Sequence, residues 1–313
     1  MNFLLWTFVL AMGSVVLVKG ADILVEGGGK TAAHFGVPAI IIGLTLFSFG
    51  STLPELASSI TAATKGRGAI PIGNVVGSNI ANILLVLGAS AMVRPIKIKR
   101  SILKREIPML FVAMFLLVIF GANGNISGVE GIILLCVLIS YLAYLFVDTY
   151  RSPGRREAAV KQTPVQFKKN ITIIVIGIIG VIIGAELIIR AAEFYIVEFG
   201  ISEGIVGLSI IALGTSLPEL VTAVTASRRG EGDISLGNVI GANIYNILLV
   251  LGICAFILPL DFSYELYISV LIMMVVTGAL ALASFTNRTL SRVEGALMVT
   301  GYVIYVIYLY VPL

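Results

Sequence analysis

The sequence is poor in charge, and this shortage bounds what the protein can be. Only 12% of the 313 residues are charged, against roughly 25% in a typical soluble chain, while 58% are hydrophobic. So few polar side chains cannot cover a water-soluble globule. We therefore expect a multi-pass protein of the cell membrane, embedded in the lipid bilayer. A disordered chain and a nucleic-acid-binding protein are disfavoured for the same reason.

Cysteine and histidine are almost absent as well. Cys136 and Cys254 both lie in apolar segments and form no disulfide framework, and with one histidine, His34, they cannot make a zinc site. No HExxH motif is present. The sequence thus predicts neither an enzyme nor a bound cofactor. The first apolar segment lacks a convincing small-residue cleavage site, so we interpret it as a membrane span and not as a signal peptide.

Long apolar segments dominate the rest of the sequence. A helix needs about 20 mostly apolar residues to cross the bilayer. Runs of this length without alternation favour helices over barrel strands. The predicted fold is therefore an all-α membrane protein with ten transmembrane helices, at about residues 3–26, 36–63, 70–93, 105–121, 126–147, 170–190, 200–227, 234–260, 264–285 and 292–311.

The basic residues predict the orientation of these spans. The loops after the odd-numbered spans hold 17 of the 21 Lys and Arg residues, and basic loops stay in the cytoplasm. Both termini are therefore expected outside, with the basic 148–169 segment as a cytoplasmic linker. A tyrosine cluster ends the last span and is expected at the membrane interface as an aromatic belt; it consists of Tyr302, Tyr305, Tyr308 and Tyr310.

An internal repeat is the strongest signal. Gly20–Gly88 aligns with Gly184–Gly252 at a constant shift of 164, with 30 identities in 69 positions. Shared hydrophobicity does not explain matching Pro, Glu, Asn and Gly, so the pattern indicates duplication. With five spans in each half, the second copy enters the bilayer from the opposite side. The prediction is two inverted five-helix repeats, residues 1–147 and 170–313, with broken helices at the centre, an architecture typical of transporters.

The repeat places a carboxylate after a proline in the middle of two spans. Pro54 and Pro218 remove one helical N–H each and free a carbonyl, while Glu55 and Glu219 follow them. A charge at the bilayer centre costs about 2.5–3.5 kcal/mol on insertion scales. A bound hard cation, which prefers oxygen ligands, explains this cost better than a pair of protonated acids. Nearby oxygens come from the carbonyls of Ser48 and Ala212 and the hydroxyls of Ser51, Thr52, Thr215 and Ser216.

Polar residues spaced by four form a stripe on the next span of each copy. Asn74, Ser78 and Asn82 share one helical face, as do Asn238, Ala242 and Asn246. Such a stripe can face the carboxylates or simply join helices. Asp22 and Glu186 are also equivalent, but they fall near span ends, where hydration or an ion pair is an equally good explanation.

At these motifs the sequence resembles the Ca²⁺/cation antiporter superfamily, in its sodium/calcium-exchanger-like branch. The resemblance rests on Gly50–Leu56 with Gly73–Asn79 and their copies, Gly214–Leu220 with Gly237–Asn243. It implies exchange of Ca²⁺ for Na⁺ at a central site between the repeats. The family's metal ligands would fall on Glu55, Glu219, Asn82, Asn246, Ser48, Ser51, Thr52, Ser78, Ala212, Thr215 and Ser216.

Two departures from the family pattern leave the counter-ion open. Sodium/calcium exchangers often carry an aspartate where Asn246 stands and a serine where Ala242 stands. Two carboxylates still neutralise one Ca²⁺, but an oxygen is lost. H⁺ and K⁺ are therefore alternatives to Na⁺ as counter-ions, and a cation channel is an alternative of a different class.

The expected mechanism is alternating access around one fixed site. Because Ca²⁺ and its counter-ion need the same carboxylates, their binding is mutually exclusive. Spans 1 and 6 are the elements expected to slide and gate the site. The two halves complete that site within one chain, so we expect the monomer to function.

Overall fold

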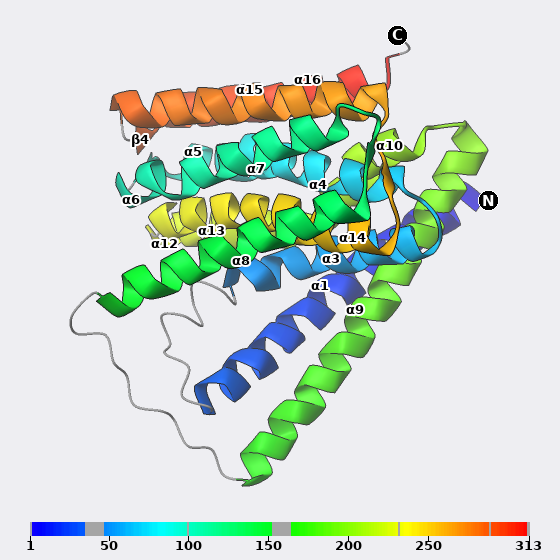
Figure 1. Ribbon diagram of the computed structural model, residues 1–313, viewed down its shortest axis with the longest axis horizontal. Coiled ribbons are helices and arrows are strands. Elements are labelled where there is room, and N and C mark those ends of the chain that lie inside the picture. The colour runs from blue at the N-terminus through cyan, green and yellow to red at the C-terminus, as the bar shows by residue number, and fades with distance from the viewer. Residues whose placement is uncertain are drawn as a thin grey trace.

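A computed structural model shows an almost entirely helical chain (Figure 1). The structure describes residues 2–34, 47–98, 100–151, 164–230, 232–287 and 289–311. The first half contains these helices, α or π (η): α1 (Asn2–His34), α3 (Phe47–Thr64), α4 (Ala69–Ala81), η2 (Asn82–Leu87), α5 (Gly88–Val93), α6 (Arg100–Lys104), α7 (Glu106–Gly121) and α8 (Gly128–Arg151).

The second half has a similar order, with a break at Ser216 that the described part of α3 lacks and with the single helix α15 in place of α6 and α7. Its helices are α9 (Pro164–Phe199), α10 (Glu203–Val206), η3 (Gly207–Ile211), α11 (Ala212–Thr215), α12 (Leu217–Arg229), α13 (Gly232–Tyr245), η4 (Asn246–Leu251), α14 (Gly252–Ile257), α15 (Tyr264–Asn287) and α16 (Arg292–Leu309). The π-helical segments η2 and η4 have the same sequence, Asn-Ile-Leu-Leu-Val-Leu, and are separated by the shift of 164.

The predicted number of ten spans is met only in part. Among the described residues, seven helices are long and apolar enough to cross a membrane, and the bent pair Glu203–Thr215 with Leu217–Arg228 makes an eighth. The other two predicted spans fall short for different reasons. The helix α7 has 16 residues, and the span predicted at 36–63 is described only from Phe47 onward.

Two short strand pairs join the halves at opposite ends of the repeat. Strand β1 (Ile96–Lys97) pairs with β4 (Thr289–Leu290), and β2 (Asn125–Ile126) pairs with β3 (Leu260–Asp261), both antiparallel. Adding 164 to the residue numbers of β1 gives those of β3, and adding 164 to those of β2 gives those of β4. The correspondence found over Gly20–Gly88 therefore extends to contacts near the end of each half.

The last helix of each half starts with the same local signal. Ser291 accepts a hydrogen bond from the Glu294 backbone N–H, and the Glu294 carboxylate accepts one from the Ser291 N–H. Ser127 and Glu130 form the same capping box at the start of α8. These reciprocal bonds satisfy N–H groups that a helix leaves open, which fixes both starting points.

The helices α1 and α9 pack against each other along their length and lie at an angle to the remaining bundle (Figure 1). Small residues allow this close approach. A Cβ added at Gly20 would come within 2.6 Å of the Val181 nitrogen, and one at Gly184 within 2.4 Å of the Leu17 nitrogen. The pair shares a second hydrophobic cluster with residues of α3, α4, α10 and η3, separate from the main core of α4, α7, α13 and α15.

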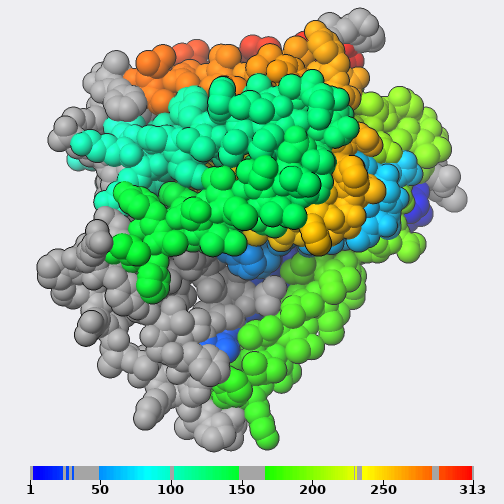
Figure 2. Space-filling model, viewed as in Figure 1, coloured from blue at the N-terminus to red at the C-terminus, as the bar shows by residue number. Residues whose placement is uncertain are grey.

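The outer surface is apolar, as a lipid-facing surface must be. In the space-filling view, α7 and α8 cover the near face (Figure 2). Both helices expose large apolar side chains, including Phe115 and Ile139. In water such surface would be costly, whereas in hydrocarbon it is not.

Candidate ion-binding site

The two repeat carboxylates lie inside the bundle, on different halves of the chain. Glu55 sits in the middle of α3 and Glu219 in the first turn of α12, and their exposed fractions are 0% and 1%. They are close enough for their charges to interact. Within the described residues, no oxygen of either carboxylate has a hydrogen-bond partner. Buried carboxylates without partners are costly and mark a functional site.

Each carboxylate lies near hydroxyl groups, most of them from the opposite half. The hydroxyls of Ser78, Thr215 and Ser216 approach Glu55, and that of Ser51 approaches Glu219, without reaching good hydrogen-bond geometry. Ser51 and Thr215 are equivalent in the repeat. The site is thus assembled across the interface between halves, which explains why neither half can form it alone.

The backbone break beside Glu219 adds a carbonyl oxygen. The Ala212 carbonyl accepts from the Ser216 N–H at 3.0 Å and lies 3.3 Å from Thr215 Oγ1 and 3.5 Å from Ser78 Oγ. The chain bends by 45° between α11 and α12 at Ser216. Pro218 stands in the first turn of α12, where its missing N–H costs nothing.

The predicted break occurs in only one of the two copies. Pro54 lies inside α3, which continues as one helix from Phe47 to Thr64. The same Leu-Pro-Glu motif therefore has two backbone conformations in one chain. The expectation of broken helices in both repeats is wrong for the described part of α3.

Four asparagines join α4 to α13 across the centre. Asn79 donates to the Asn243 carbonyl at 3.2 Å, and Asn243 donates to the Asn79 carbonyl at 3.3 Å. Asn82 donates to the Asn243 side chain and Asn246 to that of Asn79, both at 3.0 Å. Asn79 and Asn243 are equivalent in the repeat, as are Asn82 and Asn246. Each hydrogen bond of the network therefore has its counterpart when the two halves are exchanged.

This network orients the two predicted amide ligands. Because the Nδ2 groups of Asn82 and Asn246 are held by it, their Oδ1 atoms remain without partners in the described region, as do the carboxylate oxygens. Sequence reasoning singled out Asn82 and Asn246 but missed Asn79 and Asn243. Asparagine occurs at both of these repeat-equivalent positions, within an apolar stretch, and this is the signal that could have identified them.

The predicted ligand residues whose side chains are described are buried, with one exception. Glu55, Glu219, Thr52, Ser78, Ala212, Thr215, Ser216, Asn82 and Asn246 are all buried, and Ser51 is partly buried. The side chain of Ser48 lies outside the described residues. Asn74 joins this region to α3: its Nδ2 donates to Ser58 and Ser59, both at 3.0 Å, and its Oδ1 accepts from Thr215 Oγ1 at 3.2 Å.

A cavity of about 130 Å³ reaches Glu219. Its lining includes Asp22 of α1, Ser51 of α3, Thr222 of α12 and Asn238 of α13, and its α12 residues come from the first two turns of that helix. The repeat equivalents of Thr222 and Asn238 are Ser58 and Asn74, which are both fully buried. Among the described residues, the surroundings of the two carboxylates therefore differ, and we call the exposed Thr222 side the open approach and the buried Ser58 side the closed approach.

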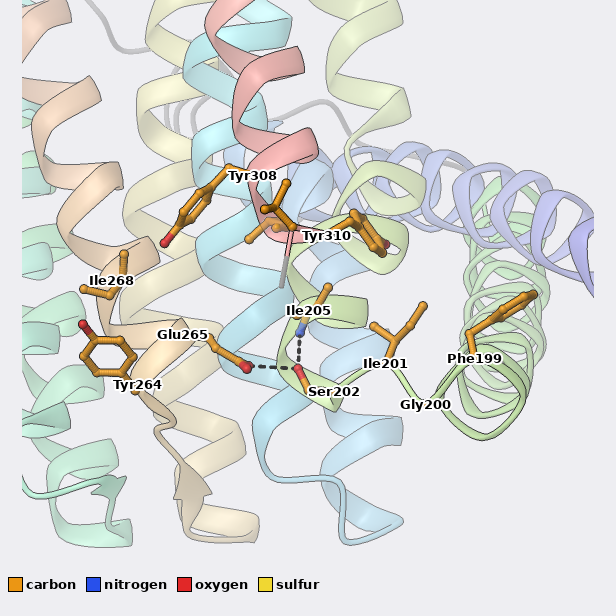
Figure 3. A pocket seen from close by; sticks show the side chains of 12 residues that line it. Phe199, Gly200, Ile201, Ser202, Ile205, Tyr264, Glu265, Ile268, Tyr308 and Tyr310 are labelled. Carbon is orange, nitrogen blue, oxygen red and sulfur yellow. Dashed lines mark hydrogen bonds between the residues drawn. The ribbon is translucent and has the colours of Figure 1, made fainter. Parts of the chain in front are cut away.

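A larger cavity lies away from the carboxylates, at the chain's C-terminal end. It measures about 490 Å³ and contains Ser202, whose hydroxyl donates to Glu265 and caps α10 (Figure 3). Tyr308 and Tyr310 line it (Figure 3). The predicted aromatic belt is wrong for Tyr302 and Tyr305, which are 6% and 4% exposed because α16 turns them into the core.

The available donors at the centre are all oxygens. Within the described residues, no group of three or more His, Cys, Asp and Glu side chains gathers that could hold a metal ion. Two carboxylates, two amides, several hydroxyls and a backbone carbonyl suit a hard cation such as Ca²⁺, which accepts mixed oxygen ligands. They do not suit zinc or copper.

Comparison with known proteins identifies the family. The family model described as sodium/calcium exchanger protein matches residues 5–147 and again residues 169–311. The chain belongs to the sodium/calcium exchanger family. As members of this family are membrane transporters, this exchanger is a multi-pass cation/Ca²⁺ antiporter, and the predicted superfamily resemblance is confirmed.

Individual relatives cover almost the whole exchanger. It is 35% identical to the putative antiporter CaxA of Alkalimonas amylolytica over 88% of this chain and 89% of that protein. It is 32% identical to the sodium/calcium exchanger MaX1 of Methanosarcina acetivorans, covering 89% and 91%. Its fold resembles the sodium-calcium exchanger NCX_Mj soaked with 10 mM Na⁺ and zero Ca²⁺, with a TM-score of 0.69, 30% identity, and coverage of 97% and 99%.

Proposed function

We propose that this protein exchanges Ca²⁺ for Na⁺ across the membrane by alternating access at the Glu55–Glu219 site. The observation that carries the proposal is the set of buried oxygens without partners: both carboxylates and the amide oxygens of Asn82 and Asn246. Two carboxylates neutralise one Ca²⁺. Sodium ions that occupy the same oxygens would exclude it, and this competition couples the two fluxes.

The same proposal includes ten transmembrane helices in two inverted repeats, residues 1–147 and 170–313, joined by 148–169. Support comes from the exchange symmetry of the asparagine network and of the two strand pairs. The separate family matches to the two halves also support it.

The gate in this proposal is the α1–α9 pair. It packs through glycines, lies at an angle to the rest of the bundle, and contacts it through a hydrophobic cluster separate from the main core. Such a pair could move as one body over the ends of α3 and α12 without disturbing the main core. Sliding in one direction would cover Asp22 and expose the region of Glu186.

H⁺/Ca²⁺ exchange by the same fold is the second candidate, and one position favours it. Ala242 is the repeat equivalent of Ser78, is 1% exposed and offers no side-chain oxygen. A Na⁺ site would have one oxygen ligand fewer at this position, whereas a proton needs only a carboxylate. K⁺ as an additional counter-ion is a variant of the first candidate.

Gradient-driven ⁴⁵Ca²⁺ uptake into proteoliposomes tests the proposal. At clamped pH and voltage, a Na⁺ gradient should drive uptake, and a K⁺ gradient alone should not. Uptake driven only by a pH gradient would replace Na⁺ by H⁺ as the counter-ion. Flux that needs no counter-gradient would indicate a channel and contradict the antiport mechanism.

A further inference from the structure

Asp22 stands at the open approach to the central site. Its exposed side chain belongs to α1 and lines the 130 Å³ cavity together with Thr222, Asn238 and Glu219. Glu219 is 1% exposed, and neither its oxygens nor Asn238 Oδ1 has a hydrogen-bond partner among the described residues. An ion that entered here would meet Asp22 before it reached Glu219.

The repeat equivalent of Asp22 is Glu186, and its surroundings are the opposite. Lys65 Nζ lies 2.9 Å from its carboxylate and Arg190 Nε lies 2.7 Å from it. Lys65 comes from the turn that follows α3. The Glu186 carboxylate is thus neutralised by two protein cations, one from its own helix and one from this turn.

We propose that Asp22 and Glu186 are peripheral binding sites for hydrated metal cations, used alternately as each approach opens. The inference rests on the proposed antiport function. A carboxylate in a narrow cavity with apolar walls concentrates cations near it. When the approach closes, the Lys65 ammonium replaces the metal cation at Glu186.

The test compares charge-neutralising variants in right-side-out and everted membrane vesicles. Asp22→Asn should raise the KM for Ca²⁺ about threefold or more in vesicles that present one face, with the maximal rate unchanged, because it removes the attraction and not the central site. Glu186→Gln should raise KM only when the other face is presented. Glu26→Gln is the matched control, since Glu26 lies one turn from Asp22 on α1, outside the cavity lining, and pairs with Lys30.

Three results would overturn this assignment. They are a KM increase for Asp22→Asn in both vesicle orientations, a lower maximal rate at unchanged KM, and an equal effect of Glu26→Gln. Asp22→Glu keeps the charge and should keep the KM near that of the wild type. If the wild type exchanges Ca²⁺ and Asp22→Asn does too with the same KM, only the peripheral site fails, and the proposed function stands.

A second measurement does not depend on the Asp22 variants. With Glu219→Gln present to disable the central site, Ca²⁺ should still slow the labelling of Thr222→Cys by an impermeant thiol reagent. With a cationic reagent the labelling rate should fall about twofold or more at saturating Ca²⁺, since a cation held at Asp22 repels the reagent from the cavity. No protection by Ca²⁺ would contradict a peripheral site.

Discussion

Asn79 and Asn243 are the residues that tie the two halves together at the centre of the molecule. Each donates to the other's backbone carbonyl and accepts from the amide of Asn246 or Asn82. All four side chains are buried. Their geometry determines which oxygens remain for an ion, so they position ligands without contacting the cargo themselves.

Replacing Asn79 by Ala should therefore lower both stability and Ca²⁺ affinity. It removes the acceptor of the Asn246 amide and the side-chain donor to the Asn243 backbone carbonyl in a dry interior, at a cost of about 1–3 kcal/mol for each group. Thermal unfolding in detergent and Ca²⁺ binding measure the two effects. Thr172→Ala is a suitable control, because Thr172 is exposed and bonds only within its own helix. An unchanged Ca²⁺ affinity in a destabilised Asn79→Ala protein would limit the asparagines to a structural role.

Much of the site could be predicted from single residues because the repeat singles them out. Glu55, Thr215 and Asn82 are found by asking which polar residues occur twice at the shift of 164 in apolar surroundings. Asn79 was missed because the spacing of four selects one helical face, and Asn79 lies on the adjacent face toward α13. Which face meets the partner helix depends on packing, and packing is not encoded in periodicity alone.

Among the helices, α1 and α9 pack closely because glycines, which have no side chain, lie at their contact. Gly184 faces the α1 backbone so closely that a Cβ added to it would lie 2.4 Å from the Leu17 nitrogen and 2.5 Å from its Cα. Close approach of this kind drives helix association in lipid, where no hydrophobic effect operates between helices.

Gly184→Ala should push α1 away from α9. Overpacking of this kind costs about 1–3 kcal/mol, and we expect a lower melting temperature together with slower exchange. The matched control is Gly278→Ala in α15, where a Cβ would meet nothing within 4 Å. That variant should be neutral or slightly stabilising, because Ala is the better helix former. Equal effects of both substitutions would show that the close contact is unimportant.

The break in α12 and its absence in α3 show what a sequence pattern leaves undetermined. Both copies carry Leu-Pro-Glu, and the sequence predicts the same break twice. A chain that is caught with one approach open cannot be symmetric, so equivalent motifs adopt different conformations. Span lengths have the same limit: the 16-residue α7 is short for the bilayer because the β1–β4 and β2–β3 pairs close its ends.

The molecule as a whole has one open and one closed approach to its carboxylates. Thr222 is exposed and lines the open cavity, while its repeat equivalent Ser58 is 0% exposed. If the halves exchange roles during transport, the two positions should exchange accessibility.

Cysteine labelling tests this exchange of roles. In a background without Cys136 and Cys254, Thr222→Cys should react with an impermeant thiol reagent from one side of the membrane. Ser58→Cys should be protected in the same state and should become reactive only from the opposite side, under turnover with opposed Ca²⁺ and Na⁺ gradients. Reaction of both cysteines from a single side would contradict alternating access.

The central claim is that Glu55 and Glu219 hold one Ca²⁺ jointly, and equilibrium Ca²⁺ binding to the purified protein tests it most directly. The account predicts one high-affinity Ca²⁺ per chain in the wild type, displaced by the counter-ion. Binding should be lost in Glu55→Gln and equally in Glu219→Gln, while both variants remain folded. Retention of wild-type affinity in either variant would contradict the account.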